Sequence, residues 1–404
     1  MPGSQTRCAD NSIEQVGRRC SGCGACASIC PFGAISFERD SEGFDVPVVS
    51  EEACTGCGLC LRRCHAHTGA SCRTGSVAYM GYARADDRRR SSSGGAFAAF
   101  ARHAFAHKER ARVYGAAFDN AGAVKHIGID DASEISRLQG SKYVQSGTAG
   151  VYADAASALE EGRFVVFSGC PCQVAGLHAF LGTRPENLLT IDLVCHGVPS
   201  PGFWEQHVQA LCEGDFRSAS FRTKGYADKN RFYLEVKGRR AAARNPEQDL
   251  FFNAFMKGLD YRESCYTCPY ASLQRPGDIT IGDCATSELR KDYYPWEQMS
   301  FIMPNTDRGA ALWREIAPSF EFCEVDIARE AAMNHQLSAP VERPSARDSF
   351  YVDLQGSGRA ALEARYTVRS CGAAFALKRV IKRLVPNRVR GALVKAKASA
   401  AHRG

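Results

Sequence analysis

Two cysteine-rich blocks near the N-terminus share one spacing. The first reads CSGCGACASICP and the second CTGCGLCLRRC, so each follows C-x2-C-x2-C-x3-C, the bacterial ferredoxin spacing for cubane iron–sulfur clusters. Three thiolates in a tight loop cap three irons, and in a two-cluster ferredoxin the fourth cysteine of each block serves the other cluster. The sequence therefore predicts two [4Fe-4S] clusters with these ligand sets: Cys20, Cys23, Cys26 and Cys64; Cys54, Cys57, Cys60 and Cys30.

Structural zinc is the alternative, because zinc sites also use C-x2-C pairs. Zinc takes four ligands per ion and gains nothing from two identical blocks of this kind, so the spacing favours iron–sulfur. We expect His65 and His67 to be surface loop residues, because the thiolate set is complete without them. Four glycines leave backbone amides free to approach inorganic sulfides: Gly22, Gly24, Gly56 and Gly58.

A second group of cysteines lies where strands are expected to end or loops to begin. Its members are Cys172 after the apolar run FVVF, Cys195 in DLVCHG, and Cys265 and Cys268 in RESCYTCPY. Four thiols from three loops are enough for one further cubane cluster. Cysteine is also among the most buried residue types, so simple packing is the open alternative.

Cys170 and Cys172 flank Pro171 in the stretch SGCPCQVAGL. This C-P-C sequence lacks the two-residue spacer of the C-x-x-C redox motif, so it is a poor candidate for a redox pair. We expect Cys170 and Cys284 to be small packing residues, and a swapped cluster ligand is the alternative for each. The remaining cysteines have no partner spacing and receive no role: Cys8, Cys72, Cys212, Cys323 and Cys371.

The elements that must position these residues alternate between strand and helix. Helical spacing covers 96–109 and 173–181, and strand-like runs cover 112–118, 163–169, 187–197 and 278–284. This alternation favours a parallel α/β sheet with functional loops at the carboxyl ends of its strands. Residues 238–248 are predicted to form an exposed loop and residues 376–385 a short basic amphipathic helix.

Length and composition are those of a soluble globular protein of two or three domains. The chain has 404 residues, 45% of them hydrophobic and 24% charged. No apolar run approaches the roughly 18–20 residues needed to span a bilayer, and the first residues lack the apolar core of a signal peptide. We therefore expect a cytoplasmic protein, in which nineteen cysteines indicate metal binding rather than disulfides.

The net charge of +7 is concentrated at the C-terminus. Residues 366–404 hold ten Lys or Arg and no acidic residue, so the rest of the chain sums to −3 and lacks the basic body of a nucleic-acid binder. The tail could lie on an anionic membrane surface, making the protein peripheral to the inner face of the membrane, or dock an acidic ferredoxin. A solvated basic extension is the alternative.

Six motifs in the remaining chain resemble one family. SSSGGAF, KYVQS, SGCPCQVAGL, NLLTIDLVCHGVPSPGFW, FRTKG and RESCYTCPYASLQRPGDITIGD occur in that order. They resemble the coenzyme F420 hydrogenase/dehydrogenase beta-subunit family, which includes beta subunits of F420-reducing hydrogenase and plant 7-hydroxymethyl chlorophyll a reductase. The resemblance runs from about Val77 to Val341, and a ferredoxin module in front is a common arrangement there.

This resemblance implies an α+β ferredoxin-like N-terminal module followed by an α/β core of the F420 hydrogenase beta-subunit type. Family members bind FAD and a cubane cluster in this core. Many of them pass electrons between iron–sulfur centres and a deazaflavin or another organic acceptor. The resemblance points to Cys172, Cys195, Cys265 and Cys268 as the ligands of a third cluster.

The same motifs supply candidate flavin and substrate residues. A helix that begins after small residues can bind a diphosphate at its N-terminus, although an ordinary N-cap is the alternative. Lys142 could contact the isoalloxazine edge or a phosphate, and His196 could relay a proton, so these two are the catalytic candidates. The further cofactor-binding candidates are Ser92, Ser93, Gly94, Gly95, Gln145 and Ser146 for FAD, and Arg222, Lys224 and Arg275 for an anionic substrate or the F420 tail.

The sequence thus predicts a two-cluster ferredoxin domain (17–70), the N-terminal part of a flavin-binding core (77–160), a C-terminal part with the third cluster and substrate loops (161–345), and a basic extension (346–404). The predicted function is an FAD- and [4Fe-4S]-dependent oxidoreductase. It would exchange electrons with ferredoxin or another electron-donor protein and reduce or oxidise an organic substrate or coenzyme F420. The alternatives are a non-autonomous electron-transfer subunit of a larger hydrogenase or dehydrogenase complex, and a zinc or scaffold protein.

Overall fold

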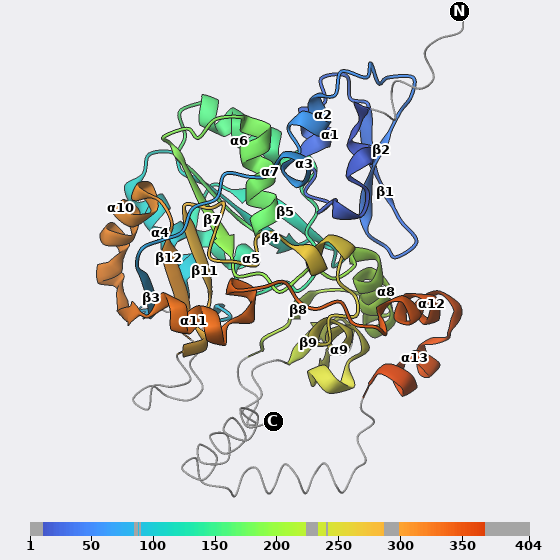
Figure 1. Cartoon of the computed structure of the whole chain (residues 1–404). Helices are drawn as coiled ribbons and strands as arrows, with labels where there is room; N and C mark the ends of the chain where they lie inside the picture. The colour runs from blue at the N-terminus through green and yellow to red at the C-terminus, as the bar shows by residue number, and fades with distance from the viewer. Residues whose placement is uncertain are drawn as a thin grey trace, which may run out of the picture.

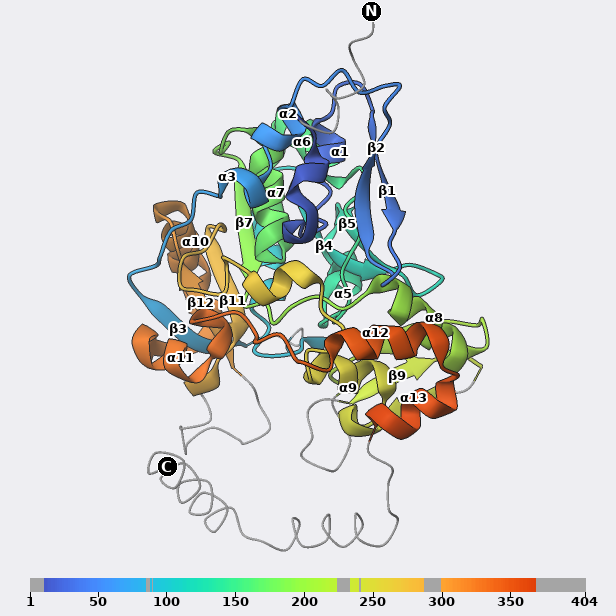
Figure 2. The ribbon, with the colours of Figure 1, turned by 45° about the vertical axis from the view of Figure 1, so that its right-hand side comes forward.

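The computed structural model of the chain describes residues 11–84, 88, 90–223, 233–239, 241–286 and 299–367. Figures 1 and 2 show three parts: an N-terminal module, a large sheet covered by helices on both faces, and a smaller sheet packed with C-terminal helices. Lys224, the helix predicted at 376–385 and most of the basic extension lie outside the described residues.

The N-terminal module is a strand pair with three short helices. Strands β1 (Ile35–Arg39) and β2 (Asp45–Val49) pair antiparallel, and a 3₁₀ helix, η2 (Ile13–Arg19), precedes them. Helices α1 (Ala25–Ile29) and α2 (Leu59–Arg62) each begin inside a cysteine block, and α3 (His65–Thr68) follows the second block. Gly24 and Gly58 cap α1 and α2 with φ of 82° and 67°, a left-handed conformation that favours glycine.

The large sheet has eight strands, and its four central strands are parallel. Their order is β11, β7, β6 and β4. The sequence predicted a parallel sheet throughout, but each edge adds antiparallel strands. The sheet draws strands from both sides of the predicted boundary at residue 160, so the two predicted core segments share one sheet. In spatial order the strands are β13 (Phe320–Val325), β3 (Ala78–Ala83), β12 (Ser300–Pro304), β11 (Ile279–Asp283), β7 (Leu188–Leu193), β6 (Val165–Gly169), β4 (Arg112–Phe118) and β5 (Val124–Ile129).

Both faces of the large sheet are buried, because its central strands are apolar on both sides. Along β6, Val166 packs with helices α4 (Ala96–His107) and α10 (Asp307–Ile316). Its neighbours Val165 and Phe167 pack on the opposite face with α6 (Val151–Glu160) and α7 (Pro171–Leu181). Two further short helices are α5 (Ile135–Leu138) and α11 (Ile327–Met333).

The smaller sheet consists of three antiparallel strands, β8 (Ser218–Ser220), β9 (Leu234–Lys237) and β10 (Ala241–Arg244). The exposed loop predicted at 238–248 was therefore wrong in part, since β10 lies within it. An aromatic core that includes Trp204 and Phe251 joins this region to the surrounding helices. These are α8 (Pro201–Cys212), α9 (Leu250–Met256), α12 (Arg347–Gly356) and α13 (Arg359–Tyr366). Among the described residues, no helix combines the length and apolar character needed to cross a membrane.

Candidate cofactor sites

The eight N-terminal cysteines surround two small cavities. Cys20, Cys23, Cys26 and Cys64 line the first cavity, and Cys30, Cys54 and Cys57 line the second. Cys60 lies on the wall of both. The structure therefore brings together the two ligand sets that the ferredoxin pairing predicts. We call the first set the inner site and the second the outer site.

The donor chemistry of the inner site fits a cluster of irons. Burial raises the pKa of Cys26, and the neighbouring thiolates of Cys23, Cys20 and Cys64 raise it further. Burial raises the pKa of Cys64 to about 11 for the same reasons. Several buried thiolates repel one another unless cations compensate them, and the irons of a cubane cluster do so. Within the described residues, no three His, Cys, Asp or Glu side chains converge on a single metal ion.

The inner site is fixed against the large sheet by hydrogen bonds to the loop that carries its cysteines. The backbone carbonyl of Cys23 accepts hydrogen bonds from Thr148 Oγ1 (2.7 Å) and Tyr152 Oη (2.8 Å). Gln145 Nε2 donates to the carbonyl of Ser21 (2.9 Å), so this predicted flavin residue binds the cluster loop instead of lining the flavin cavity. Helix α1 packs against α7, and both views show the module beside α6 and α7 (Figures 1 and 2).

The second group of cysteines converges on one cavity of about 360 Å³, which we call the core site. Strands β6 and β7 are parallel neighbours, so the residues that follow their carboxyl ends meet at one edge of the sheet. Cys172 lies in the first turn of α7 after β6, and Cys195 follows β7. Cys265 and Cys268 come from the 3₁₀ helix η6 (Glu263–Thr267) and its C-cap. Burial, together with the Cys195 thiolate, raises the pKa of Cys265 to about 12, so these thiols also fit a cluster of cations.

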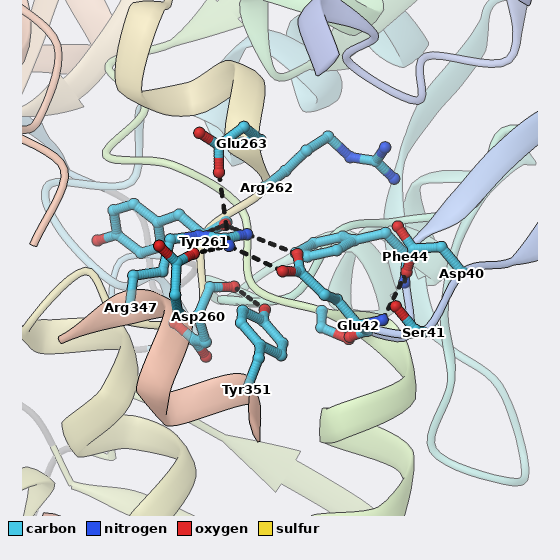
Figure 3. A network of polar contacts seen from close by, with 12 residues as sticks. Asp40, Ser41, Glu42, Phe44, Asp260, Tyr261, Arg262, Glu263, Arg347 and Tyr351 are labelled. Atoms are coloured by element: carbon cyan, nitrogen blue, oxygen red, sulfur yellow. Dashed lines mark hydrogen bonds and ion pairs between the residues drawn. The ribbon is translucent and has the colours of Figure 1, made fainter. Parts of the chain in front are cut away.

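A buried arginine clamps the loop that leads into Cys265 and Cys268 (Figure 3). Arg347 of α12 donates two hydrogen bonds to Glu42, at 2.8 and 2.6 Å, and a third to the carbonyl of Tyr261 at 3.0 Å. Its side chain is 2% exposed and that of Glu42 28% exposed. Arg262, which follows Tyr261 in the chain, donates to the carbonyl of Asp45 (2.8 Å). The N-terminal module, the core-site loop and α12 are thus held together at one point.

The predicted flavin residues surround a separate cavity of about 260 Å³, the flavin cavity. The predicted flavin residues on its wall are Ser92, Ser93, Gly95, Lys142 and Ser146, and the proton-relay candidate His196 and the substrate candidate Arg222 line it too. Gly94 does not, because it packs against the backbone, where a Cβ would meet Gly81 O and Ser300 N. The cavity lies between the N-terminus of α4 and the ends of the central strands.

Lys142 provides a cationic group in this cavity. Its Nζ donates to three carbonyl oxygens at the end of α5, those of Gln139 (2.8 Å), Leu138 (3.1 Å) and Arg137 (3.3 Å). Burial lowers the pKa of Lys142 to about 7, so the ammonium is easily deprotonated when nothing anionic faces it. An anionic cofactor would favour the charged form.

The two predicted substrate arginines have different surroundings. Arg222 lines the flavin cavity and donates from Nη1 to both carboxylate oxygens of Asp283, at 2.9 and 2.7 Å. Arg275 lies outside the cavity, 1% exposed, where it is paired with the fully buried Asp192 (2.8 Å) and donates to the carbonyl of Leu193. Its surroundings indicate that Arg275 fixes the end of β7, just before Cys195, and does not line the cavity.

Several residues that contribute to these sites were not predicted from the sequence. His126, on β5, lines the flavin cavity and is hydrogen-bonded on both ring nitrogens. Its Nε2 must donate to the carbonyl of Ser168 (2.9 Å), and burial lowers its pKa to about 4, so Nδ1 accepts from the hydroxyl of Ser146 (2.8 Å). Gln173 donates to the same hydroxyl oxygen (3.0 Å). No sequence motif marks His126, whose partners lie 20 and 42 residues away.

Shared walls connect the sites. Ser21, His65 and Ala66 line both the inner site and the core site. The segment 195–198 lines both the core site and the flavin cavity, and burial lowers the pKa of His196 within it. Cys170 lies on the flavin cavity with its Sγ 3.8 Å from that of Cys195. Their hydrogen bond lowers the pKa of Cys195 to about 7 and raises that of Cys170.

Comparison with known proteins places two segments of the chain in families. Residues 162–328 match the family described as the C terminus of the beta subunit in coenzyme F420 hydrogenase/dehydrogenase, and residues 19–68 match the 4Fe-4S dicluster domain. The predicted resemblance and the iron–sulfur character of the N-terminal module are thus confirmed. Among solved structures, a chain of the xenon-derivatised F420-reducing [NiFe] hydrogenase complex from Methanosarcina barkeri is 16% identical, with a TM-score of 0.43 over 67% of this chain and 97% of that chain. No curated protein matches the chain.

Proposed function

Because this chain is an iron–sulfur protein related to the beta subunits of coenzyme F420 hydrogenases and dehydrogenases, we propose that it is an iron–sulfur flavoprotein oxidoreductase. In this proposal the outer, inner and core sites each hold a [4Fe-4S] cluster, and the flavin cavity holds FAD. Electrons pass between these centres and an organic substrate or coenzyme F420.

The observation that carries the proposal is that each site shares a wall residue with the next site. The outer and inner sites share Cys60, the inner and core sites share His65, and the core site and flavin cavity share Cys195. The four sites therefore form one continuous series. Such an order suits electron transfer through the protein and has no evident purpose in four unrelated binding sites.

The outer site is the end that a donor protein can reach. Cys57 is exposed, whereas the other seven N-terminal cysteines are buried or half-buried. The nearby Phe32 is 53% exposed. We infer that ferredoxin or another electron-donor protein docks here.

The chain's own residues in the flavin cavity suit an anionic, two-electron cofactor. FAD, when bound, accepts electrons singly or in pairs and so couples cluster chemistry to hydride-equivalent chemistry on a substrate. The N-terminus of α4, which has twelve residues, presents free amides beside Ser92, Ser93 and Gly95 for a diphosphate. Lys142 supplies a cation, which stabilises negative charge on the cofactor.

Arg222 and His196 suit the substrate side of the same cavity. Because Asp283 holds the guanidinium of Arg222 on the cavity wall, this guanidinium can bind an anionic group of the substrate. His196, kept neutral by burial, can donate or accept a proton there.

A second candidate function follows from the family description, which names a beta subunit. In that case the chain would move electrons only as part of a larger hydrogenase or dehydrogenase complex. The isolated, loaded chain distinguishes the two candidates. Turnover of F420 or another acceptor with dithionite or reduced ferredoxin supports the autonomous enzyme, and full reduction of its centres without turnover supports the electron-transfer role within a complex.

The proposal is tested by anaerobic purification of the full chain with quantification of iron, sulfide and flavin. We expect about twelve irons per chain, corresponding to three cubane clusters, together with one FAD. Cys172→Ala should lose about four of these irons, the content of one cubane. Cys212→Ala, which changes a buried cysteine of α8 in the aromatic core, is the matched control and should keep them all. A colourless, zinc-loaded protein would overturn the proposal, and Cys172→Ala with full iron would reject the core site.

A further inference from the structure

Cys170 is a fifth thiol beside the core site and has no role in the proposed electron path. It is the N-cap of α7, and its side chain lies on the flavin cavity. Its Sγ is 3.8 Å from Sγ of Cys195, a residue that lines both the core site and the flavin cavity. The pair therefore lies between the two proposed centres.

The geometry of this pair is that of a hydrogen bond between sulfurs. A disulfide would bring the sulfurs to about 2.05 Å, far closer than they are. A cubane cluster takes one thiolate per iron, and Cys172, Cys195, Cys265 and Cys268 already supply four around the core site. Cys170 does not line the core site, so it is placed beside a ligand and not as a ligand.

The backbone around Cys170 is held in position. Pro171 occupies the first turn of α7, where its ring fixes φ. Gln173 Oε1 accepts the backbone N–H of Cys170 (3.0 Å), and Gln173 Nε2 donates to Ser146 Oγ (3.0 Å). His126 accepts from Ser146 and donates to the carbonyl of Ser168, which closes the network on the same turn. This network keeps the Cys170 thiol directed at Cys195.

The protonation states of the two sulfurs set the direction of the hydrogen bond. A cysteine that binds iron does so as a thiolate and carries no proton. Once Cys195 is a ligand, only Cys170 can supply the proton between the two sulfurs. Hydrogen bonds to cluster sulfurs stabilise the additional negative charge of the reduced cluster, and they are one of the factors that set its reduction potential.

We propose that Cys170 is a positioning residue whose S–H donates to the Cys195 thiolate and raises the reduction potential of the core cluster. This inference rests on the proposed function, because it requires a cluster at the core site. The bond reaches the cluster on the side of the flavin cavity, so it makes the centre next to the flavin a better electron acceptor from the inner site.

Redox titration of the full, anaerobically loaded chain tests the inference. Cys170→Ala removes the donor, and Cys170→Ser restores a donor of similar size. The EPR signal of the core cluster reports its midpoint potential. In Cys170→Ala this midpoint potential should be lower than in the wild type. At the wild-type midpoint potential, the ratio of reduced to oxidised core cluster in the variant should therefore be at least threefold smaller. Cys170→Ser should recover most of the shift, and the signals of the inner and outer clusters should not move.

The outcomes separate this inference from the proposed function. An unchanged core-cluster midpoint in Cys170→Ala, with full iron content, overturns the inference and leaves the proposed function standing. Loss of about four irons from Cys170→Ala also overturns it, because Cys170 would then be a ligand of a cubane. Absence of any core-cluster signal from the wild type overturns the proposed function itself. If the alanine variant does not fold, the isosteric pair Cys170→Thr and Cys170→Val gives the same comparison of donor with no donor.

Discussion

A hydrogen bond of 2.8 Å between the hydroxyl of Tyr270 and Nδ1 of His65 joins the inner site to the core site. His65 follows Cys64, and Tyr270 lies two residues after Cys268. Burial lowers the pKa of His65 to about 4, so the ring is neutral; its Nδ1 faces Tyr270 and its Nε2 faces Ser21 Oγ at 3.3 Å. The expectation that His65 is a surface loop residue was wrong, since only 5% of it is exposed.

Tyr270→Phe should destabilise the contact between these two loops without removing a cluster. The substitution leaves a buried ring nitrogen without its hydrogen-bond partner, which costs about 1–3 kcal/mol. The thermal midpoint of the loaded chain should fall, while its iron content stays that of the wild type. Tyr82→Phe is the control, because the hydroxyl of Tyr82 bonds Glu321 at an exposed position and its loss should matter less. A midpoint equal to that of the wild type would contradict this role of Tyr270.

Arg347→Ala should be among the more destabilising single changes in the chain. It leaves Glu42 and the carbonyl of Tyr261 without their main partner. Breaking a fully buried ion pair costs about 3–5 kcal/mol, and the 28% exposure of Glu42 places the expected loss at the lower end of this range. Arg217→Ala is the control: Arg217 is 67% exposed and pairs with Asp215, so its loss should cost less than about 1 kcal/mol. Thermal unfolding of both variants checks the difference, and equal losses would refute the clamp.

The outer cluster should be the first to be lost in air. Its ligand Cys57 is exposed, whereas the cysteines of the inner and core sites are buried or half-buried. On controlled exposure of the loaded chain to oxygen, about four irons should be released several-fold faster than the rest, as expected for one cubane. Cys57→Ala, loaded anaerobically without this cluster, should lack the fast phase. Release of all irons at one rate would contradict the prediction that the outer cluster is the most accessible to oxygen.

His126 should contribute to acid lability. Its pKa is lowered to about 4 in the folded chain against an ordinary value of 6.5, so the unfolded state binds the proton more readily. Stability from this group is complete above about pH 6.5 and is lost as the pH falls toward 4, by up to about 3 kcal/mol. In His126→Gln the unfolding midpoint should fall less steeply over this range than in the wild type. If the unfolding midpoints of the wild type and His126→Gln fell in parallel with pH, His126 would not be neutral in the folded chain.

Lys142→Met should weaken flavin binding. A hydrogen bond to a charged group contributes about 1.5–3 kcal/mol, so the FAD dissociation constant should rise roughly 10- to 100-fold. Because the pKa of Lys142 is about 7 in the absence of an anion, wild-type affinity should fall as the pH rises through 7, and the variant should lack this dependence. Lys142→Arg keeps the charge and should bind at high pH better than the wild type. Fluorescence titration of the flavin-free chain with FAD gives these dissociation constants. If the wild-type dissociation constant did not change with pH, Lys142 would be excluded as the cation that binds FAD.

The parts of the sites that could be predicted are those encoded by local spacing. The ferredoxin pattern places Cys20 and Cys54 in their loops, and strand–turn–helix order places Cys172 at the end of β6. Partners distant in sequence could not be predicted. Arg275 looked like a substrate residue because nothing local shows that Asp192, 83 residues away, neutralises it.

The same limit explains the other corrections. Gln145 sits in a flavin-like motif, but its amide binds Ser21, 124 residues earlier. Helices α12 and α13 lie within residues 346–404, which were predicted to form a basic extension. Their stability comes from packing of Phe350 and Tyr366 against the aromatic core rather than from a strong pattern of their own. Tertiary contacts, and not local propensity, decided each of these cases.

The Glu42–Arg347 pair has a consequence for biosynthesis, because its partners are 305 residues apart in the chain. A ribosome releases both N-terminal cysteine blocks long before it reaches α12, so these blocks can acquire iron while translation continues. The loop with Cys265 and Cys268 receives its clamp only when residue 347 has been made. We therefore expect the core cluster to be inserted last, after translation is nearly complete, and prematurely terminated chains to emerge with two clusters and an open third site.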